Sequence, residues 1–209
     1  MCTERILVLT FLCVWGSEVT AIDGSDGYMT PDFCRGHKCP RYRVVEKHEI
    51  FEVREYEPTN WASTIVNLSC DYISQSDRLY EYIRGANEKG TKMDMTLPFS
   101  VFVPTREKTK KQPLSLFFLP SKFESPEPLD SSIYVYGYPA LTWYIRSFDG
   151  ISNLENCFNQ AQVLAKELVH LKKPFDDTFF ACNFYNGPYQ LNNRHNEAAL
   201  MLKHIEKSD

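Results

Sequence analysis

The strongest constraint on the fold is that one succession of expected elements occurs twice along the chain. Two short strands, a helix and two further strands are expected in residues 42–120 and again in residues 132–203. In both copies a tyrosine precedes a tryptophan at the same spacing across a proline-containing turn, as Tyr56 precedes Trp61 and Tyr138 precedes Trp143. The repetition predicts one α+β domain: a distorted antiparallel β-barrel with two pseudo-symmetric halves and a helix packed on each half.

The helix of the first copy is expected in residues 71–84. Its apolar residues recur at spacings near three and four, which is typical of one face of an amphipathic helix: Tyr72, Ile73, Leu79, Tyr80 and Ile83. Gly85 follows, and a residue in the left-handed conformation commonly ends a helix. Residues 92–96 then alternate with period two, which predicts a strand from about Met93 to Val103.

The helix of the second copy is expected to begin at a capping box. Ser152 and Glu155 have the spacing at which their side chains can bond the first free amides of a helix. A wide apolar stripe follows, made of Leu154, Phe158, Ala161, Leu164, Ala165, Leu168 and Leu171. Pro174 ends the pattern, because proline cannot continue a helix.

The beginning of the chain has the pattern of a secretory signal peptide. An arginine precedes the apolar run from Ile6 to Trp15, and small residues at Val19 and Ala21 suit cleavage after Ala21. The run is too short to span a membrane, and no later stretch approaches the required length. We therefore expect residues 1–21 to be a signal peptide, residues 22–41 an extended leader and residues 42–209 the domain of a secreted monomer.

The cysteines that follow the signal peptide fit an oxidising compartment. Cys34 and Cys39 are close in sequence and are expected to form a disulfide. A metal site made by these two cysteines and His37 is the alternative, but a short loop with no fourth ligand nearby disfavours it. The pairing of the remaining cysteines, Cys70, Cys157 and Cys182, stays open.

The expected surface is glycosylated and does not suit nucleic acid. Asn67 opens an Asn-Leu-Ser acceptor sequence and is the expected N-glycosylation site. The formal net charge is −4, and the only basic run, residues 106–111, is expected to be a solvated hairpin tip. This balance gives no basic groove for nucleic acid.

Several short segments resemble the SOUL, or haem-binding protein, family. They are Val53 to Pro58 with Trp61, Asn87 to Lys89, Lys92 to Pro98, Arg146 to Gly150, Tyr185 to Pro188 and Asn193 to Glu197. The similarity extends from about residue 42 to residue 203 and is greatest to the SOUL branch of the family. It implies the two-copy barrel, and it implies reversible, non-covalent binding of haem or another tetrapyrrole as cofactor and partner.

The resemblance also implies a position for the ligand, an apolar groove beside the first helix with cations near the haem propionates. The residues of this expected cofactor site are Leu79, Tyr80, Ile83, Arg78 and Arg84. The alternative is that the apolar members face the sheet as core, which is the commoner use of such a stripe.

The iron ligand remains open. Some family members have a histidine, proposed as the axial ligand, where this chain has Glu55, and a carboxylate is a poor substitute for imidazole. Other residues of ligating type are Met93, Met95, Tyr80 and Tyr82, and the histidines His48, His170, His195 and His204.

The sequence also leaves two other function classes open. The chain could be an extracellular interaction or scaffold protein that binds no cofactor. It could also be a hydrolase-like enzyme, if Glu55 faced inward beside Phe51 and Val53 as a general acid or base. No catalytic motif supports an enzyme, and we expect Glu55 to pair with a cation at the barrel rim. The last family segment, with Asn193, Arg194, Asn196 and Glu197, is expected to be a structural turn network and not a site.

Overall fold

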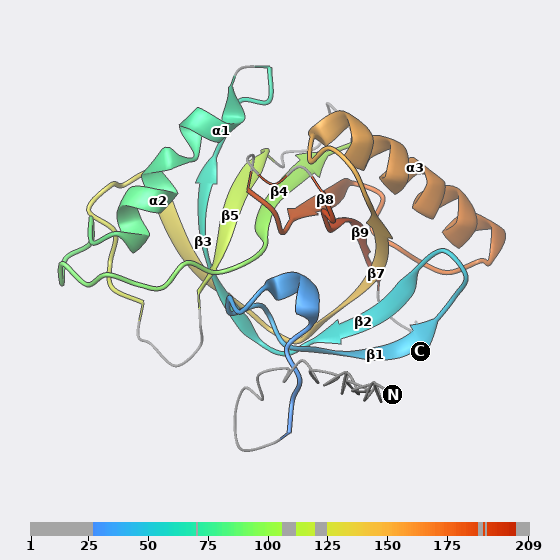
Figure 1. Cartoon of the computed structure of the whole chain (residues 1–209). Coiled ribbons are helices and arrows are strands. Elements are labelled where there is room, and N and C mark those ends of the chain that lie inside the picture. The colour runs from blue at the N-terminus through green and yellow to red at the C-terminus, as the bar shows by residue number, and fades with distance from the viewer. Residues whose placement is uncertain are drawn as a thin grey trace, which may run out of the picture.

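A computed structural model describes residues 27–69, 71–105, 112–119, 125–187, 190 and 192–203. Nine strands in this part of the chain form a curled antiparallel sheet in the order β1-β2-β7-β9-β8-β4-β5-β3-β6 (Figure 1). The strands are β1 (Tyr42–Lys47), β2 (Glu52–Tyr56), β3 (Thr59–Ile65), β4 (Phe99–Pro104), β5 (Leu114–Leu119), β6 (Ile133–Tyr138), β7 (Leu141–Phe148), β8 (Phe179–Phe184) and β9 (Asn196–Met201). The predicted α+β architecture, a distorted antiparallel barrel, is confirmed, and the sheet closes it as a half-barrel.

The strand order has the two-fold symmetry that the repeated sequence predicts. Exchanging β2 with β6, β3 with β7, β4 with β8 and β5 with β9 returns the same order read backwards. The axis of this exchange lies between β4 and β8, which pair antiparallel from Phe99 opposite Phe184 to Pro104 opposite Phe179. β1 lies outside the symmetric set and extends the sheet at β2.

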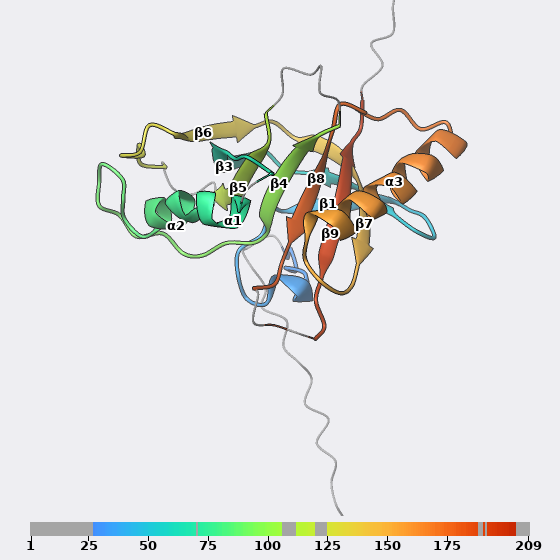
Figure 2. The same cartoon turned by 90° about the horizontal axis from the view of Figure 1, so that it is seen from above.

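The helices cover the outer face of the sheet (Figures 1 and 2). α3 (Leu154–His170) packs on β7, β8 and β9 through Cys157, Ala161, Leu164 and Leu168. α1 (Tyr72–Gln75) and α2 (Asp77–Ile83) belong to the first copy, and Leu79 and Tyr82 of α2 pack against Phe117 of β5. Because strand side chains alternate between faces, the residues between these core positions point to the opposite, inner face.

The helical segments differ from the prediction in two details. The first helix is interrupted at Ser76, whose hydroxyl donates to the Tyr72 carbonyl oxygen. The second helix is capped by the Asn153 side chain, which accepts from the Asn156 amide, and not by Ser152. The Ser152 hydroxyl is instead engaged with Asn196, so the predicted capping box is wrong.

The strand expected from Met93 begins only at Phe99. Residues 92–95 alternate in polarity but have no strand partner, and Thr96 forms only an isolated parallel bridge with Lys38. A cis peptide bond joins Leu97 to Pro98 immediately before β4. Gly85 has φ +116° directly after the end of the first helical region, as the expected helix stop requires.

The segment before β1 is not simply extended. One turn of 3-10 helix, η1 (Asp32–Cys34), is followed by the expected disulfide between Cys34 and Cys39, so these cysteines and His37 do not form a metal site. Cys34 is buried against Leu97 and Tyr185.

A second disulfide, between Cys157 and Cys182, ties α3 to β8. Cys70, the expected signal peptide and the basic run 106–111 lie outside the described residues. Among the residues that are described, no helix has both the length and the apolar character to cross a membrane.

Candidate functional site

The inner face of the curled sheet encloses a cavity of about 480 Å³. This volume is in the range of small-molecule and cofactor sites. Aromatic side chains from both copies line the cavity: Tyr56, Trp61, Phe102, Tyr138, Trp143 and Phe179. Since Tyr56 and Tyr138 lie toward opposite ends of the sheet order, only its curvature can bring them to one cavity.

The alternation of the central strands places these residues and also leaves the space between them. Ala181 on β8 pairs with Ala199 on β9, and both alanines line the cavity. Ile145 on β7 pairs with Ala199 on its other side. Two alanines side by side fill little volume, so the rings of Tyr56, Phe102 and Trp143, which pack against them, leave space at the centre.

The two tryptophans are held in place by different neighbours. The Trp61 indole Nε1 donates to the Thr59 hydroxyl at 2.9 Å. The Trp143 ring packs against Phe102 and Phe179, with ring centroids 5.9 Å away in each case. Both indoles line the cavity. The spacing shared by the two copies of the sequence therefore places one tryptophan of each copy in the cavity lining.

The floor of the cavity is polar and is connected to a buried carboxylate. The Ser100 hydroxyl donates to Asn183 Oδ1 at 2.8 Å, and Asn183 Nδ2 donates to Glu197 Oε2 at 3.3 Å. The Tyr185 hydroxyl donates to the same Glu197 oxygen at 3.0 Å. Ser100, Asn183 and Tyr185 line the cavity, whereas Glu197 lies fully buried behind them.

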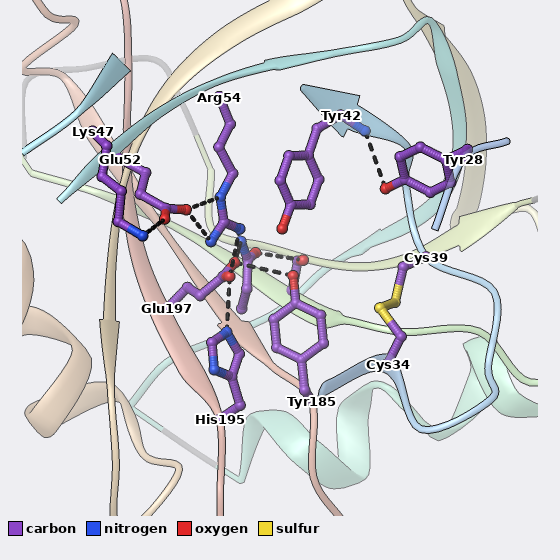
Figure 3. Close-up of polar contacts among 12 residues, drawn as sticks. Tyr28, Cys34, Cys39, Tyr42, Lys47, Glu52, Arg54, Tyr185, His195 and Glu197 are labelled. Atoms are coloured by element: carbon purple, nitrogen blue, oxygen red, sulfur yellow. Dashed lines mark hydrogen bonds and ion pairs between the residues drawn. A yellow bond between two sulfur atoms is a disulfide. The ribbon is translucent and has the colours of Figure 1, made fainter. Parts of the chain in front are cut away.

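Glu197 is neutralised by a buried arginine (Figure 3). Arg54 Nη1 donates to Glu197 Oε1 at 2.7 Å, and His195 Nε2 lies 2.9 Å from the same oxygen. Arg54 also bonds Glu52, which in turn pairs with Lys47. Burial alone would raise the pKa of the Glu197 carboxyl, but Arg54 and His195 outweigh burial and lower this pKa to about 2. Glu197 is therefore ionised at neutral pH.

The N-terminal segment covers this charged cluster with aromatic rings. Phe33 stacks on His195 with 4.0 Å between ring centroids and meets Tyr185 edge-on at 4.8 Å. The Arg54 guanidinium lies 4.4 Å from the centroid of the Tyr42 ring. Burial, together with the Glu197 charge, raises the pKa of the Tyr185 hydroxyl well above its usual range. The phenol therefore stays protonated and acts as a donor.

The helix-one residues of the expected cofactor site lie outside this cavity. Leu79 and Ile83 are buried in the core beneath the helix, and Tyr80 packs edge-on against Phe117. Arg78 donates to the Ser132 hydroxyl, and the largely exposed Arg84 is 3.9 Å from Glu81. None of these five residues lines the large cavity, and the described pocket nearest to this helix, beside Met93, measures only about 90 Å³.

Glu55 does not face inward. Its side chain is 39% exposed and pairs with Arg43 on β1 at the rim of the sheet, so the inward orientation that the enzymatic interpretation needed is wrong and the rim pair is confirmed. Phe51 and Val53 are buried in the core beneath α3, as expected.

The other ligating types are distributed over separate parts of the chain. Tyr82 is buried and donates to the Pro126 carbonyl oxygen; burial raises its pKa to about 12. Met93 and Met95 pack at the edge of the core beneath the first helix. His48 stacks on Phe51, His170 lies in the last turn of α3, and His204 is outside the described residues. In the described chain, no group of three or more His, Cys, Asp or Glu side chains is arranged to hold a metal.

Sequence reasoning missed the cavity and the ion pair at its floor. Arg54 and Glu197 both lie in family-like segments, but nothing in either segment indicates that the two meet. The matched tyrosine–tryptophan spacing predicts the repeated fold, and it is also a sequence pattern whose residues all line the cavity. The last family segment is structural in part, because Asn196 Nδ2 donates to the Gly150 carbonyl oxygen.

Comparison with known proteins gives a consistent result. The family model described as SOUL heme-binding protein matches residues 37–201. Human Heme-binding protein 2 is 36% identical over 163 residues, which cover 73% of this chain and 78% of that protein. Heme-binding protein 1 of Bos taurus is 31% identical over 128 residues, covering 59% of this chain and 66% of that protein.

Solved structures support the fold alone. A hydrolase from Listeria innocua superposes with a TM-score of 0.54 at 8% identity, covering 76% of this chain and 94% of that chain. The C-terminal domain of EcmrR superposes with a TM-score of 0.51 at 13% identity, covering 78% of this chain and 99% of that domain.

Proposed function

Because this chain belongs to the SOUL heme-binding protein family, we propose that it binds haem or a related tetrapyrrole non-covalently, in the cavity on the inner face of the sheet. One observation carries the choice of site: aromatic side chains of both copies, including Trp61 and Trp143, face a single cavity. Large, mostly apolar cavities with a few converging polar groups are the usual binding sites for planar organic ligands.

The cavity suits the flat macrocycle of haem better than it suits the haem iron or the propionates. The rings of Trp61, Trp143 and Phe102 would hold the flat apolar surface, and the small Ala181 and Ala199 leave room for its edge. No histidine or cysteine is among the described lining residues, and burial raises the pKa of Tyr56, Tyr138 and Tyr185, which disfavours a phenolate ligand. An iron ligand from this lining would therefore be Met201. Bound haem would supply its own iron chemistry, and this chain's part is to hold the ring and limit its contact with water.

We further propose that the protein acts outside the cell, as a monomer. The two disulfides support this, because structural disulfides persist in oxidising compartments. The pattern of residues 1–21 supports it independently. Expression in cultured cells tests the proposal: the protein should be recovered from the medium, migrate as a monomer and carry a glycan on Asn67. Retention inside the cells would contradict it.

Titration with hemin tests the binding function. The full chain with Trp15→Phe keeps only Trp61 and Trp143, both of which line the cavity, so its fluorescence reports on that site. Hemin should shift the Soret band and quench this fluorescence along the same saturable curve. A spectrum equal to that of free hemin would refute haem binding and favour the alternative of a scaffold without a cofactor.

Matched variants then separate the cavity from the helix-one groove. Ala181→Phe fills the cavity from its centre and should weaken hemin binding at least about tenfold. Ala181→Met is the milder companion, in case the larger ring prevents folding. Arg78→Ser with Arg84→Ser removes the cations of the groove and should leave affinity unchanged. The reverse pattern would place the ligand beside the first helix.

A further inference from the structure

We infer that this cavity accepts a planar ring without negative charge and excludes carboxylates from its interior, so that any carboxylates of the ligand stay at the mouth. The inference rests on the proposed use of the cavity and specifies the class of ligand. It departs from the expectation that cations beside the ring meet the propionates.

The first observation is the charge of the lining. Among the described lining residues there is no lysine, arginine or histidine, and the one charged side chain is Glu57. The Glu57 side chain is 58% exposed and lies 3.6 Å from Arg41, so it marks the rim. A carboxylate moved from water into such an interior loses its hydration and gains no cation in exchange.

The second observation is the direction of the hydrogen bonds at the floor. Ser100 donates to Asn183, and Asn183 and Tyr185 both donate to Glu197. In these three hydrogen bonds the hydroxyl and amide donors point toward the buried carboxylate or its partner Asn183, and not into the cavity. A ligand carboxylate at the floor would have to compete with Glu197 for the same donors, and the two negative charges would repel.

The third observation is that the nearest buried cation is committed. Arg54 bonds Glu197 and Glu52 and lies behind the floor, outside the lining. A ligand carboxylate could recruit Arg54 only by leaving Glu197 buried without its partner. That exchange is unfavourable, because breaking a buried ion pair is far more costly than leaving a carboxylate in water.

The mouth and the floor can be distinguished by exposure. Glu57, Gln112 and Pro139 line the cavity and are exposed, whereas Ser100, Ala181 and Ala199 line it and are buried. A ring that enters between the exposed residues reaches the alanines first with its apolar edge. A substituent on a flexible chain can stay at the mouth, but one fixed to the buried edge cannot.

Three fluorescent probes with the same ring test this inference in the Trp15→Phe chain. They are 1-pyrenemethanol, which is neutral, pyrene-1,6-dicarboxylate, whose charges are fixed at opposite ends of the ring so that one of them enters in either orientation, and 1-pyrenebutyrate, whose charge is on a flexible chain. The neutral and the flexible probe should quench Trp61 and Trp143 with similar affinity. The probe with the charges on its ring should bind at least about tenfold more weakly.

Two variants complete the design. Ala181→Phe, or Ala181→Met if the former does not fold, should abolish quenching by 1-pyrenemethanol, which shows that this probe occupies the cavity. Gln112→Lys adds a cation at the mouth and should strengthen 1-pyrenebutyrate binding about two- to threefold, an effect that salt screens, without changing the affinity for 1-pyrenemethanol.

The outcomes also separate this inference from the proposed function. Equal or tighter binding of pyrene-1,6-dicarboxylate, or failure of 1-pyrenemethanol to bind, would overturn the inference whatever hemin does. Failure of hemin alone, with the predicted order of the pyrene probes, would overturn haem binding and leave the ligand class intact.

Discussion

Arg54 and Glu197 are 143 positions apart in sequence, yet Arg54 Nη1 and Glu197 Oε1 lie 2.7 Å apart and both side chains are buried. Arg54 lies on β2 of the first copy and Glu197 on β9 of the second, with β7 between the two strands. The pair therefore joins strands of the two sequence copies directly behind the floor of the cavity. Since Asn183 and Tyr185 both bond Glu197, the same pair also fixes the orientation of two lining side chains.

Replacing Glu197 with glutamine should destabilise the fold strongly. The change removes the buried partner of the Arg54 guanidinium and leaves it with the partly exposed Glu52 alone; breaking a buried ion pair typically costs about 3–5 kcal/mol. Urea unfolding followed by circular dichroism measures the loss. A double variant that adds Arg54→Met should recover part of it, because the stranded charge is then removed.

Glu55 is the matched control for this prediction. It is a carboxylate on β2, one residue from Arg54, but its partner Arg43 is largely exposed. Glu55→Gln should change the free energy of unfolding by less than about 1 kcal/mol, since exposed ion pairs contribute little. Equal losses for Glu55→Gln and Glu197→Gln would show that burial of the Arg54–Glu197 pair does not matter to stability.

The same carboxylate predicts a loss of stability in acid. The pKa of Glu197 is lowered from 4.5 to about 2 in the folded protein, so the unfolded chain takes up a proton first as the pH falls. The contribution is fully present above pH 4.5 and is lost progressively between about pH 4.5 and pH 2. It amounts to about 3 kcal/mol by linkage.

Unfolding free energies measured across this pH range, in wild type and Glu197→Gln, isolate the effect from other carboxylates. Glu46 and Asp130 also have lowered pKa values, through hydrogen bonds from Lys173 and Ser132, respectively, and both variants retain them. The wild type should lose more stability than the variant on acidification. Parallel curves would mean that the pKa of Glu197 is not lowered by folding.

The sequence is sufficient to predict the repeated architecture because the repetition is a local signal. Each strand pair and helix shows its own periodicity, and the interval from Tyr56 to Trp61 recurs from Tyr138 to Trp143. The limits of the elements are less predictable. The alternation of residues 92–95 is typical of a strand, but a strand also needs a neighbour, and β4 finds β5 and β8 only from Phe99 onward.

The cavity could not be predicted because its parts meet only through the curvature of the sheet. The apolar stripe of the first helix is a visible pattern, and it belongs to the core, with Leu79 fully buried. The cavity lining is built from alternate residues of strands in both copies. In the sequence, each of these residues has the pattern of an ordinary half-buried strand position. Which strand ends approach one another depends on the order of the strands and on their twist, neither of which is a local property.

The two disulfides should differ in their contribution to stability. The Cys157–Cys182 bond spans 25 positions and the Cys34–Cys39 bond spans 5. Loop-closure entropy in the unfolded chain then predicts losses of about 3 and about 2 kcal/mol for the respective double alanine variants. Denaturant unfolding of each variant measures these losses, and unfolding of the wild type under reducing conditions provides the control. A larger loss for Cys34 and Cys39 would show that anchoring Phe33 and Tyr185 outweighs loop entropy.

The two tryptophans of the cavity lining, Trp61 and Trp143, should report a bound ligand equally. Two full-length variants, Trp15→Phe with Trp61→Phe and Trp15→Phe with Trp143→Phe, each retain a single tryptophan in the cavity. If hemin lies between the walls, energy transfer to it should quench either indole strongly, and the two titrations should give the same dissociation constant. A ligand in the helix-one groove would instead lie on the outer face of β3 and β5. That position is nearer to Trp61, which is on β3, than to Trp143. Quenching confined to the Trp61-containing variant would therefore move the site out of the cavity.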